Sequence, residues 1–370
     1  MGVLECIVHR VPMRDPGDIS SILGLIEAGC LAPREIVAIL GKTEGNGCVN
    51  DFTRGYATMA VSNALARHLD IPADEVAARI AIVMSGGTEG GLSPHFLVFA
   101  VRENGGPSDG VKSLAIGTAS TPALLPEQIG HIFQVEVTAT AVREAMERAA
   151  ITDIADVHWV QVKCPLLTKE RMADAASRGE ITATHDPYTS MALSRAAAAL
   201  GVAVALGEVD IAALGDPVIG RDFDLWSSCA SASAGVELMH NQIIVLGNSA
   251  AWSGDNVIAH SVMRDAIDLP SLIGVLRGLD FKDTDSWATR RRVASWRCLP
   301  RPRRPGAVAS AGRATLWGTT ATSRPAVMRA PFVGGVLAGF IGRTDLFVSG
   351  GAEHQGPEGG GPIAVIARRR

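Results

Sequence analysis

A motif that occurs three times constrains the fold of this chain more than any other feature of its sequence. The motif is Ser-x-Gly-x-Glu at the end of an apolar segment, and a second apolar segment follows it about ten residues later. Its three copies begin at Ser85, Ser233 and Ser349. One copy would carry little information, but three copies with matching flanks indicate a structural unit that is present three times.

A second element precedes the motif in the first two copies. The pattern of an amphipathic helix leads to an apolar strand pattern that ends on a lysine, at Lys42 and at Lys163. An arginine then opens an Ala-rich helix pattern, at Arg54 and at Arg195. Helix and strand patterns in this mixture predict an α/β (α+β) fold of three similar repeat units. We place the units at residues 1–104, 112–250 and 255–370.

The middle of the third unit departs from this pattern. Residues 287–330 are rich in Arg and Pro and contain no Lys, Asp or Glu. Two interpretations are open. The segment is a disordered basic linker, or it is the product of a double frameshift in the gene or its sequencing. In the second case, a reading frame that starts at the third base of each codon can encode an apolar strand that ends on a lysine. A Ser-Arg pair that begins a helix follows it.

Composition excludes several classes of protein. The formal net charge of −4 argues against a general nucleic-acid binder. No apolar run reaches the roughly 18 residues of a membrane span, and the first residues lack the features of a secretory signal. The six cysteines contain no Cys-x-x-Cys pair that would indicate a zinc or disulfide framework. We therefore expect a cytoplasmic protein that binds neither nucleic acid nor membranes.

A lysine and a serine in each of the first two units are the components of a nucleophile pair. A serine hydroxyl becomes a good nucleophile when a neighbouring base takes its proton, and a lysine with a lowered pKa can be that base. Nearby cations lower a lysine pKa, and backbone N–H groups of a Gly-rich turn can hold an oxyanion. A single strand-end lysine is usually solvated and a Ser-Gly-Gly turn is often only a turn. The repetition favours the chemical interpretation.

Longer stretches of the sequence resemble the cyanuric acid amidohydrolase/barbiturase family of ring-opening amidohydrolases. These stretches are residues 41–51, 83–90, 160–168, 230–235 and 348–357. The resemblance implies that the three units lie in a pseudo-threefold arrangement around a central active site, and that the protein is a homotetramer. It also implies hydrolytic opening of cyanuric acid to carboxybiuret, which loses carbon dioxide to give biuret, as in s-triazine degradation.

The same resemblance implies roles for individual residues. Ser233 is expected to be the nucleophile, Lys163 its general base and Lys42 a supporting residue. The residues expected to hold the ring are Arg54, Ser85, Gly86, Arg195, Ala234, Ser349 and Gly350. No organic cofactor is expected. A structural Mg²⁺ is expected on oxygen atoms, which hard cations prefer, of Ala352, Gln355, Gly356, Pro357 and Gly360.

The sequence leaves two alternative functions open. Nothing in the composition distinguishes a triazine from a pyrimidine ring, so the protein can instead be a barbiturase that opens barbiturate. It can also be a catalytically impaired ligand-binding protein, because the third unit as written lacks its Lys and Arg.

Overall fold

The first unit is built around a sheet with the order β3-β2-β4-β1, which the short strand β9 extends beyond β1. The computed structural model describes residues 3–88, 91–104, 110–281, 325–349, 351, 353–357 and 359–369. Strands β2 and β3 are parallel, and β4 runs antiparallel to both β2 and β1. The elements are β1 (Val3–Pro12), α1 (Ser20–Glu27), β2 (Ile36–Lys42), α2 (Thr53–Leu69), α3 (Ala73–Arg79), β3 (Ala81–Ser85), β4 (His95–Asn104) and β9 (Trp252–Ser253).

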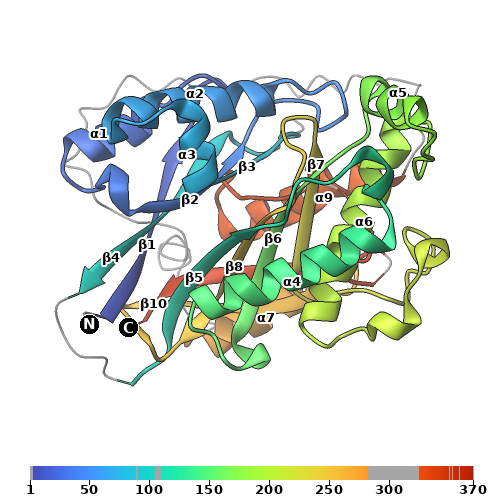
Figure 1. Cartoon of the computed structure of the whole chain (residues 1–370). Coiled ribbons are helices and arrows are strands. Elements are labelled where there is room, and N and C mark those ends of the chain that lie inside the picture. The colour runs from blue at the N-terminus through green and yellow to red at the C-terminus, as the bar shows by residue number, and fades with distance from the viewer. Residues whose placement is uncertain are drawn as a thin grey trace.

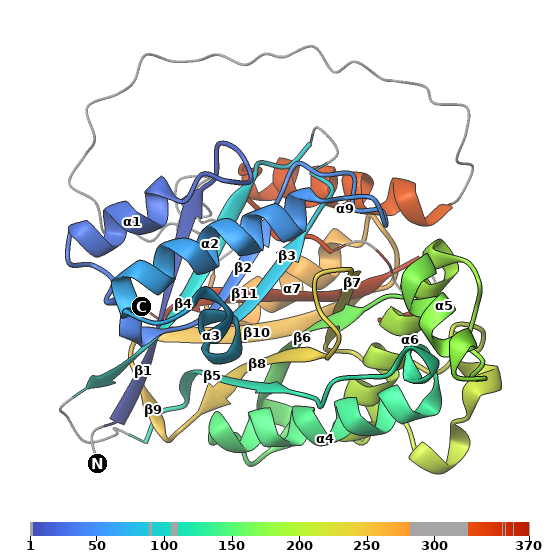
Figure 2. The ribbon, with the colours of Figure 1, turned by 45° about the horizontal axis from the view of Figure 1, so that its top comes forward.

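The second unit repeats this topology. Its sheet has the order β5-β8-β6-β7, so the first strand again lies beside the last, followed by the lysine strand and the serine strand. The elements are β5 (Ser113–Ser120), α4 (Ile132–Arg148), β6 (Val157–Pro165), α5 (Lys169–Ser177), α6 (Pro187–Ala205), β7 (Ala230–Gly235) and β8 (Gln242–Ser249). Figure 2 shows the helices of the two units on opposite outer sides, with the strands between them.

The third unit keeps only the first and last strands of that sheet among its described residues. Strands β10 and β11 pair antiparallel, whereas residues 346–348, which precede the third serine, form no strand. The expected lysine strand falls in residues 287–330. Residues 287–324 lie outside the described residues, and residues 325–330 begin helix α9. The elements are β10 (Asn256–Met263), α7 (Leu269–Gly278), α9 (Pro325–Ile341) and β11 (Gly361–Arg368).

A capping residue marks where the long helix α6 of the second unit begins. Asp186 precedes α6, and its side chain accepts hydrogen bonds from the backbone N–H groups of Tyr188 and Thr189. Pro187 occupies the first turn, where no N–H is needed. Short 3₁₀ helices connect other elements: η1 (Pro33–Glu35), η2 (Pro126–Gln128), η3 (Ile154–Asp156), η4 (Ile211–Ala213) and η5 (Asp216–Val218).

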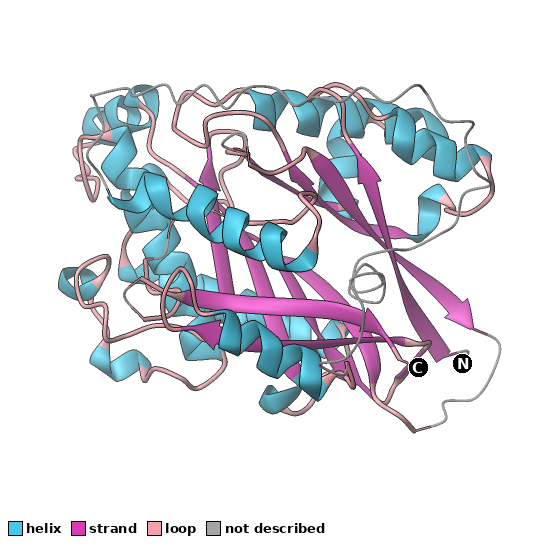
Figure 3. Cartoon of the chain, turned by 180° about the vertical axis from the view of Figure 1, so that it is seen from behind, coloured by secondary structure: helices cyan, strands magenta, loops and turns pink. Residues whose placement is uncertain are grey.

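One apolar core joins the sheets. The largest cluster of buried side chains contains Val8 from β1, Val162 from β6 and Ile258 from β10, one from each unit. Figures 1 and 3 show the strands in the middle of the molecule and most helices around them. The mixed α/β fold of repeated units is confirmed. The unit boundaries at residues 1–104, 112–250 and 255–370 stay a prediction, and β9 lies between the last two ranges and joins the first sheet.

Helix α6 is long and apolar enough to cross a membrane by length and composition alone. However, 72% of its apolar stretch is buried inside the protein, which is typical of a core helix. The predicted cytoplasmic location stays a prediction.

Candidate functional site

Strand register places each lysine beside the serine of its own unit. Lys42 on β2 is the register partner of Ser85 on β3, and Lys163 on β6 is the register partner of Ser233 on β7. Register partners on neighbouring strands point to the same face of a sheet. The first two units therefore present the same pair of side chains at the same position.

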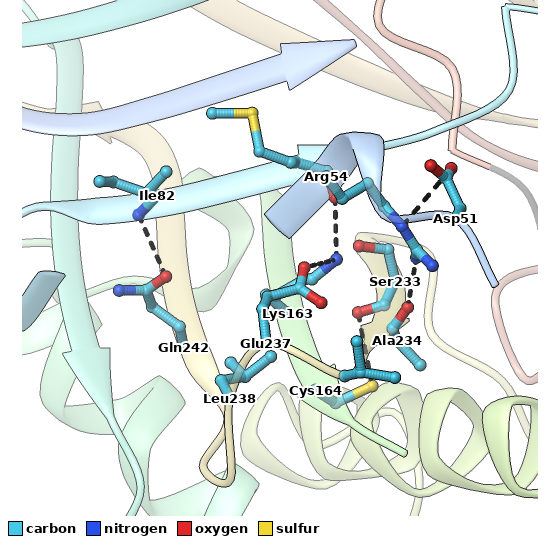
Figure 4. A network of polar contacts seen from close by, with 12 residues as sticks. Asp51, Arg54, Ile82, Lys163, Cys164, Ser233, Ala234, Glu237, Leu238 and Gln242 are labelled. Atoms are coloured by element: carbon cyan, nitrogen blue, oxygen red, sulfur yellow. Dashed lines mark hydrogen bonds and ion pairs between the residues drawn. The ribbon is translucent and has the colours of Figure 1, made fainter. Parts of the chain in front are cut away.

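The amine of Lys163 lies in the interior and contacts two oxygen acceptors. The residue is 1% exposed, and its Nζ lies 2.8 Å from Oε1 of Glu237, the last residue of its own motif. Nζ also donates a hydrogen bond to the carbonyl of Met84 at 2.8 Å. Met84 directly precedes Ser85, so Lys163 joins the second unit to the serine turn of the first. Figure 4 shows Lys163, Ser233 and Glu237 grouped together.

The amine of Lys42 makes the corresponding contact one unit further round. It donates to the carbonyls of Gly86 and Val348, both at 2.6 Å, and to Oγ of Ser85 at 3.4 Å. Val348 directly precedes Ser349, as Met84 precedes Ser85. Each lysine thus reaches the residue before the serine of another unit, as a pseudo-threefold arrangement requires.

The two arginines reach in the opposite direction. Arg54 of the first unit donates to the carbonyl of Ala234 at 2.6 Å, next to Ser233. Arg195 of the second unit donates to both carboxylate oxygens of Glu353, at 3.0 and 2.8 Å, in the motif of the third unit. Bidentate arginine–carboxylate pairs fix geometry well. The predicted lysines, arginines and serines of different units are therefore brought together.

The surroundings of Lys163 lower its pKa. Burial lowers the pKa of Lys163, the positive charge of Arg54 lowers it further, and the carboxylate of Glu237 opposes both. Burial alone would raise the pKa of Glu237, but the cations Lys163 and Arg54 outweigh burial and lower it. A lysine with a lowered pKa next to a serine is the arrangement that activates a nucleophile.

Two of the three motif serines have hydroxyl oxygens that need a partner. The Oγ atoms of Ser233 and Ser349 are buried and have no hydrogen-bond partner in the part of the chain that the structure describes. Buried polar atoms are nearly always hydrogen-bonded. A polar ligand in this centre would supply the missing partners.

Of the other predicted ring-binding residues, Gly86 has a clear steric role. A Cβ at this position would lie 1.9 Å from Oδ2 of Asp51, so only glycine fits beside that carboxylate. Asp51 is buried and accepts hydrogen bonds from the N–H groups of Gly47 and Thr53. Ala234 contributes the carbonyl that binds Arg54, and Gly350 lies outside the described residues.

Sequence reasoning missed the carboxylates of the site. Glu237 and Glu353 bind Lys163 and Arg195, and their signal was available, because both end the repeated motif. Asp51 forms a 3.6 Å ion pair with Arg54. It lies in residues 41–51, which resemble the family, but no role was predicted for it. The carbonyl groups of Met84 and Val348 belong to the backbone, so side-chain types could not predict them as acceptors.

The predicted Mg²⁺ site offers neutral donors in its described part. Gln355 uses its side-chain oxygen to accept from the N–H of Ala232 at 2.9 Å, and the carbonyl of Pro357 accepts from the N–H of Gly360 at 2.9 Å. The carboxylate of Glu353 is paired with Arg195. No cluster of three His, Cys, Asp or Glu side chains occurs among the described residues, whereas Mg²⁺ is usually held by one or two carboxylates. Ala352 lies outside the described residues, and the Mg²⁺ site stays a prediction.

The fold and the site define a class: a repeated α/β protein whose buried lysine, arginine and serine side chains come from different units to one polar centre. The chain matches the model of the family described as amidohydrolase ring-opening protein over residues 7–368. It therefore belongs to this family, and the resemblance found in the sequence is confirmed.

Relatives and solved structures cover nearly the whole chain. A cyanuric acid amidohydrolase of Azorhizobium caulinodans is 49% identical over 362 residues, 98% of each chain. One of a Pseudomonas species is 47% identical over 370 residues, 99% of this chain and 100% of the relative. A structure described as "Cyanuric acid hydrolase: evolutionary innovation by structural concatenation" superposes with a TM-score of 0.87 at 43% identity, covering 99% of this chain and 100% of the other. The cyanuric acid hydrolase structure from A. caulinodans gives 0.84 at 46% identity, covering 99% of each chain.

Proposed function

We propose that this protein hydrolyses the ring of cyanuric acid to carboxybiuret, which then loses carbon dioxide to give biuret. The observation that carries the proposal is the register pairing of Lys163 with Ser233 in a buried polar centre. The names of the relatives support cyanuric acid as the substrate class.

Lys163 is the general base of the proposed reaction. Its Nζ donates a hydrogen bond to the carbonyl of Met84 and lies 2.8 Å from the carboxylate of Glu237. In the proposed reaction the neutral amine takes the hydroxyl proton of Ser233 with its lone pair. Ser233 Oγ then attacks a ring carbonyl carbon, and protonated Lys163 returns the proton to the departing ring nitrogen. Water hydrolyses the resulting acyl-enzyme. No step uses a metal ion.

The threefold arrangement suits the symmetry of the proposed substrate. Cyanuric acid has three equivalent carbonyl groups; each of the three motifs offers a serine, and the first two units each add an arginine. Arg54 and Arg195 supply guanidinium N–H groups, and Ser85 and Ser349 supply hydroxyls from the other two motifs. Donors held in place before the reaction stabilise negative charge that develops on a carbonyl oxygen.

A catalytically impaired binding protein is a second candidate. It is favoured by the third unit, which has two strands among its described residues where the other units have four or more. Incubation with cyanuric acid and with barbituric acid, followed by ultraviolet absorbance of the ring, separates the candidates. Loss of cyanuric acid supports the proposal, and loss of barbiturate alone indicates a barbiturase. Calorimetric binding without loss of either ring indicates the impaired protein.

The homotetramer and the Mg²⁺ ion belong to the same proposal and have separate tests. Light scattering coupled to size exclusion reports the number of chains directly. After treatment with EDTA, titration with Mg²⁺ should raise the melting temperature if the loop formed by residues 352–360 holds the ion. An unchanged melting temperature argues against it.

A further inference from the structure

An apolar cavity of about 670 Å³ lies beside β11 in the third unit. Leu272 of α7 and Leu337 of α9 line it from the helices, and Trp159 lines it from β6 of the second unit. The segment that precedes the third serine contributes Leu346 and Phe347. The cavity is therefore bordered by two helices and the segment before Ser349 of the third unit, and by one strand of the second unit.

The edge of β11 faces this cavity. Six consecutive residues, 361–366, are among its lining. Successive side chains of a strand point to opposite faces, so a consecutive run of lining residues indicates that the strand presents its edge. Strand β10 pairs with the other edge, and no described strand pairs with this one. An open edge offers N–H and C=O groups to a further strand.

The first two units show what fills the corresponding position. The last strand of the first unit, β4, pairs there with β2 in antiparallel orientation. The last strand of the second unit, β8, pairs with β6 in the same way. Both β2 and β6 are largely buried and apolar, and each carries its lysine at or near the end. The cavity beside β11 has the position and the apolar lining for a strand of this kind.

The polar end of the cavity matches the lysine of such a strand. Ser349 and Glu353 both line the cavity, and Ser349 Oγ has no partner in the described part of the chain. In the other units the lysines contact the corresponding side chains: Lys42 donates to Ser85, and Lys163 pairs with Glu237. An ammonium group entering beside Ser349 would find both kinds of acceptor, and it would share the carboxylate of Glu353 with Arg195.

We propose that the β11 cavity binds, in trans, an extended apolar peptide that ends on a lysine. The peptide adds to the sheet antiparallel to β11, its side chains fill the apolar cavity, and its ammonium group binds Ser349 and Glu353. Main-chain hydrogen bonds give affinity in this mode of recognition and side-chain pockets give specificity.

The test uses the chain's own lysine strand as the probe. A synthetic peptide with the sequence of residues 36–42, joined at its N-terminus to a polar linker and a fluorophore, is titrated with the full chain and followed by fluorescence anisotropy. We expect saturable binding. Proline in place of Ile39 in the peptide removes a backbone donor. It should raise Kd about tenfold, which corresponds to about 1.4 kcal/mol of binding free energy. A Lys42→Gln change in the peptide should weaken binding by several fold.

A protein variant identifies the end at which the lysine binds. With Ser349→Ala, the preference for the lysine peptide over the glutamine peptide should shrink, while the proline peptide still binds weakly. No saturable binding, or equal binding of the parent and proline peptides, would overturn the proposal. If the chain is a dimer and the peptide does not dissociate it, a second copy of the chain covers the edge instead, which also contradicts the proposal. None of these readouts depends on hydrolysis of any ring.

Discussion

Lys163 and Ser233 are neighbours across the parallel pair β6–β7, and the Lys163 amine is bonded at the same time to the carbonyl of Met84 in another sheet. The base of the proposed reaction is thus held from two directions by backbone that the core fixes. A side chain held in this way loses little freedom when the substrate arrives, which favours reaction from a pre-organised geometry.

Replacing either member of the pair should abolish turnover while the fold is kept. We expect Ser233→Ala and Lys163→Met each to lower kcat for cyanuric acid by about 10³-fold, within the range for loss of a nucleophile or its base. Circular dichroism checks that the variants fold. Ser177→Ala on exposed α5 is the control and should leave kcat unchanged. Near-normal activity of either site variant would refute the assignment.

The pH profile of kcat/KM should move in opposite directions for two neighbours of Lys163. The proposed base works as the neutral amine, so activity rises with pH through its pKa. Glu237 raises the pKa of Lys163 and Arg54 lowers it. Glu237→Gln should therefore shift the rising limb to lower pH, and Arg54→Gln should shift it to higher pH. Shifts in the same direction, or none, would show that Lys163 does not set this limb.

Breaking the Arg195–Glu353 pair, which joins the second and third units, should destabilise the protein. Both side chains are largely buried, with 10% and 16% exposed, and removing one member leaves the other charge buried without its partner. We expect Arg195→Met to lower the free energy of unfolding by about 3 kcal/mol, measured by urea denaturation. Arg79→Ala, which breaks an exposed ion pair on α3, is the matched control and should have little effect.

The sequence predicted the repeated unit because its signal is local and periodic. Apolar runs ending on Lys42 and Lys163 and serines opening glycine turns predict strands and turns without tertiary information. It did not predict that Lys163 reaches Met84, because that contact depends on how two sheets pack. The β10–β11 pair, which leaves the other edge of β11 without a partner strand among the described residues, was equally hidden, since it joins segments about 100 residues apart.

Two glycines in different packing environments should respond to alanine in opposite ways. A Cβ at Gly117 on β5 would lie 1.9 Å from the carbonyl oxygen of Ala145 in α4, so the helix would have to move away from the sheet. We expect Gly117→Ala to destabilise the protein by about 1–3 kcal/mol. At Gly274 in α7 nothing lies within 4 Å of the added atom, and alanine should stabilise the helix by about 0.5–1 kcal/mol. Thermal unfolding of both variants measures the difference, and a stabilised Gly117→Ala protein would contradict the close packing of α4 on β5.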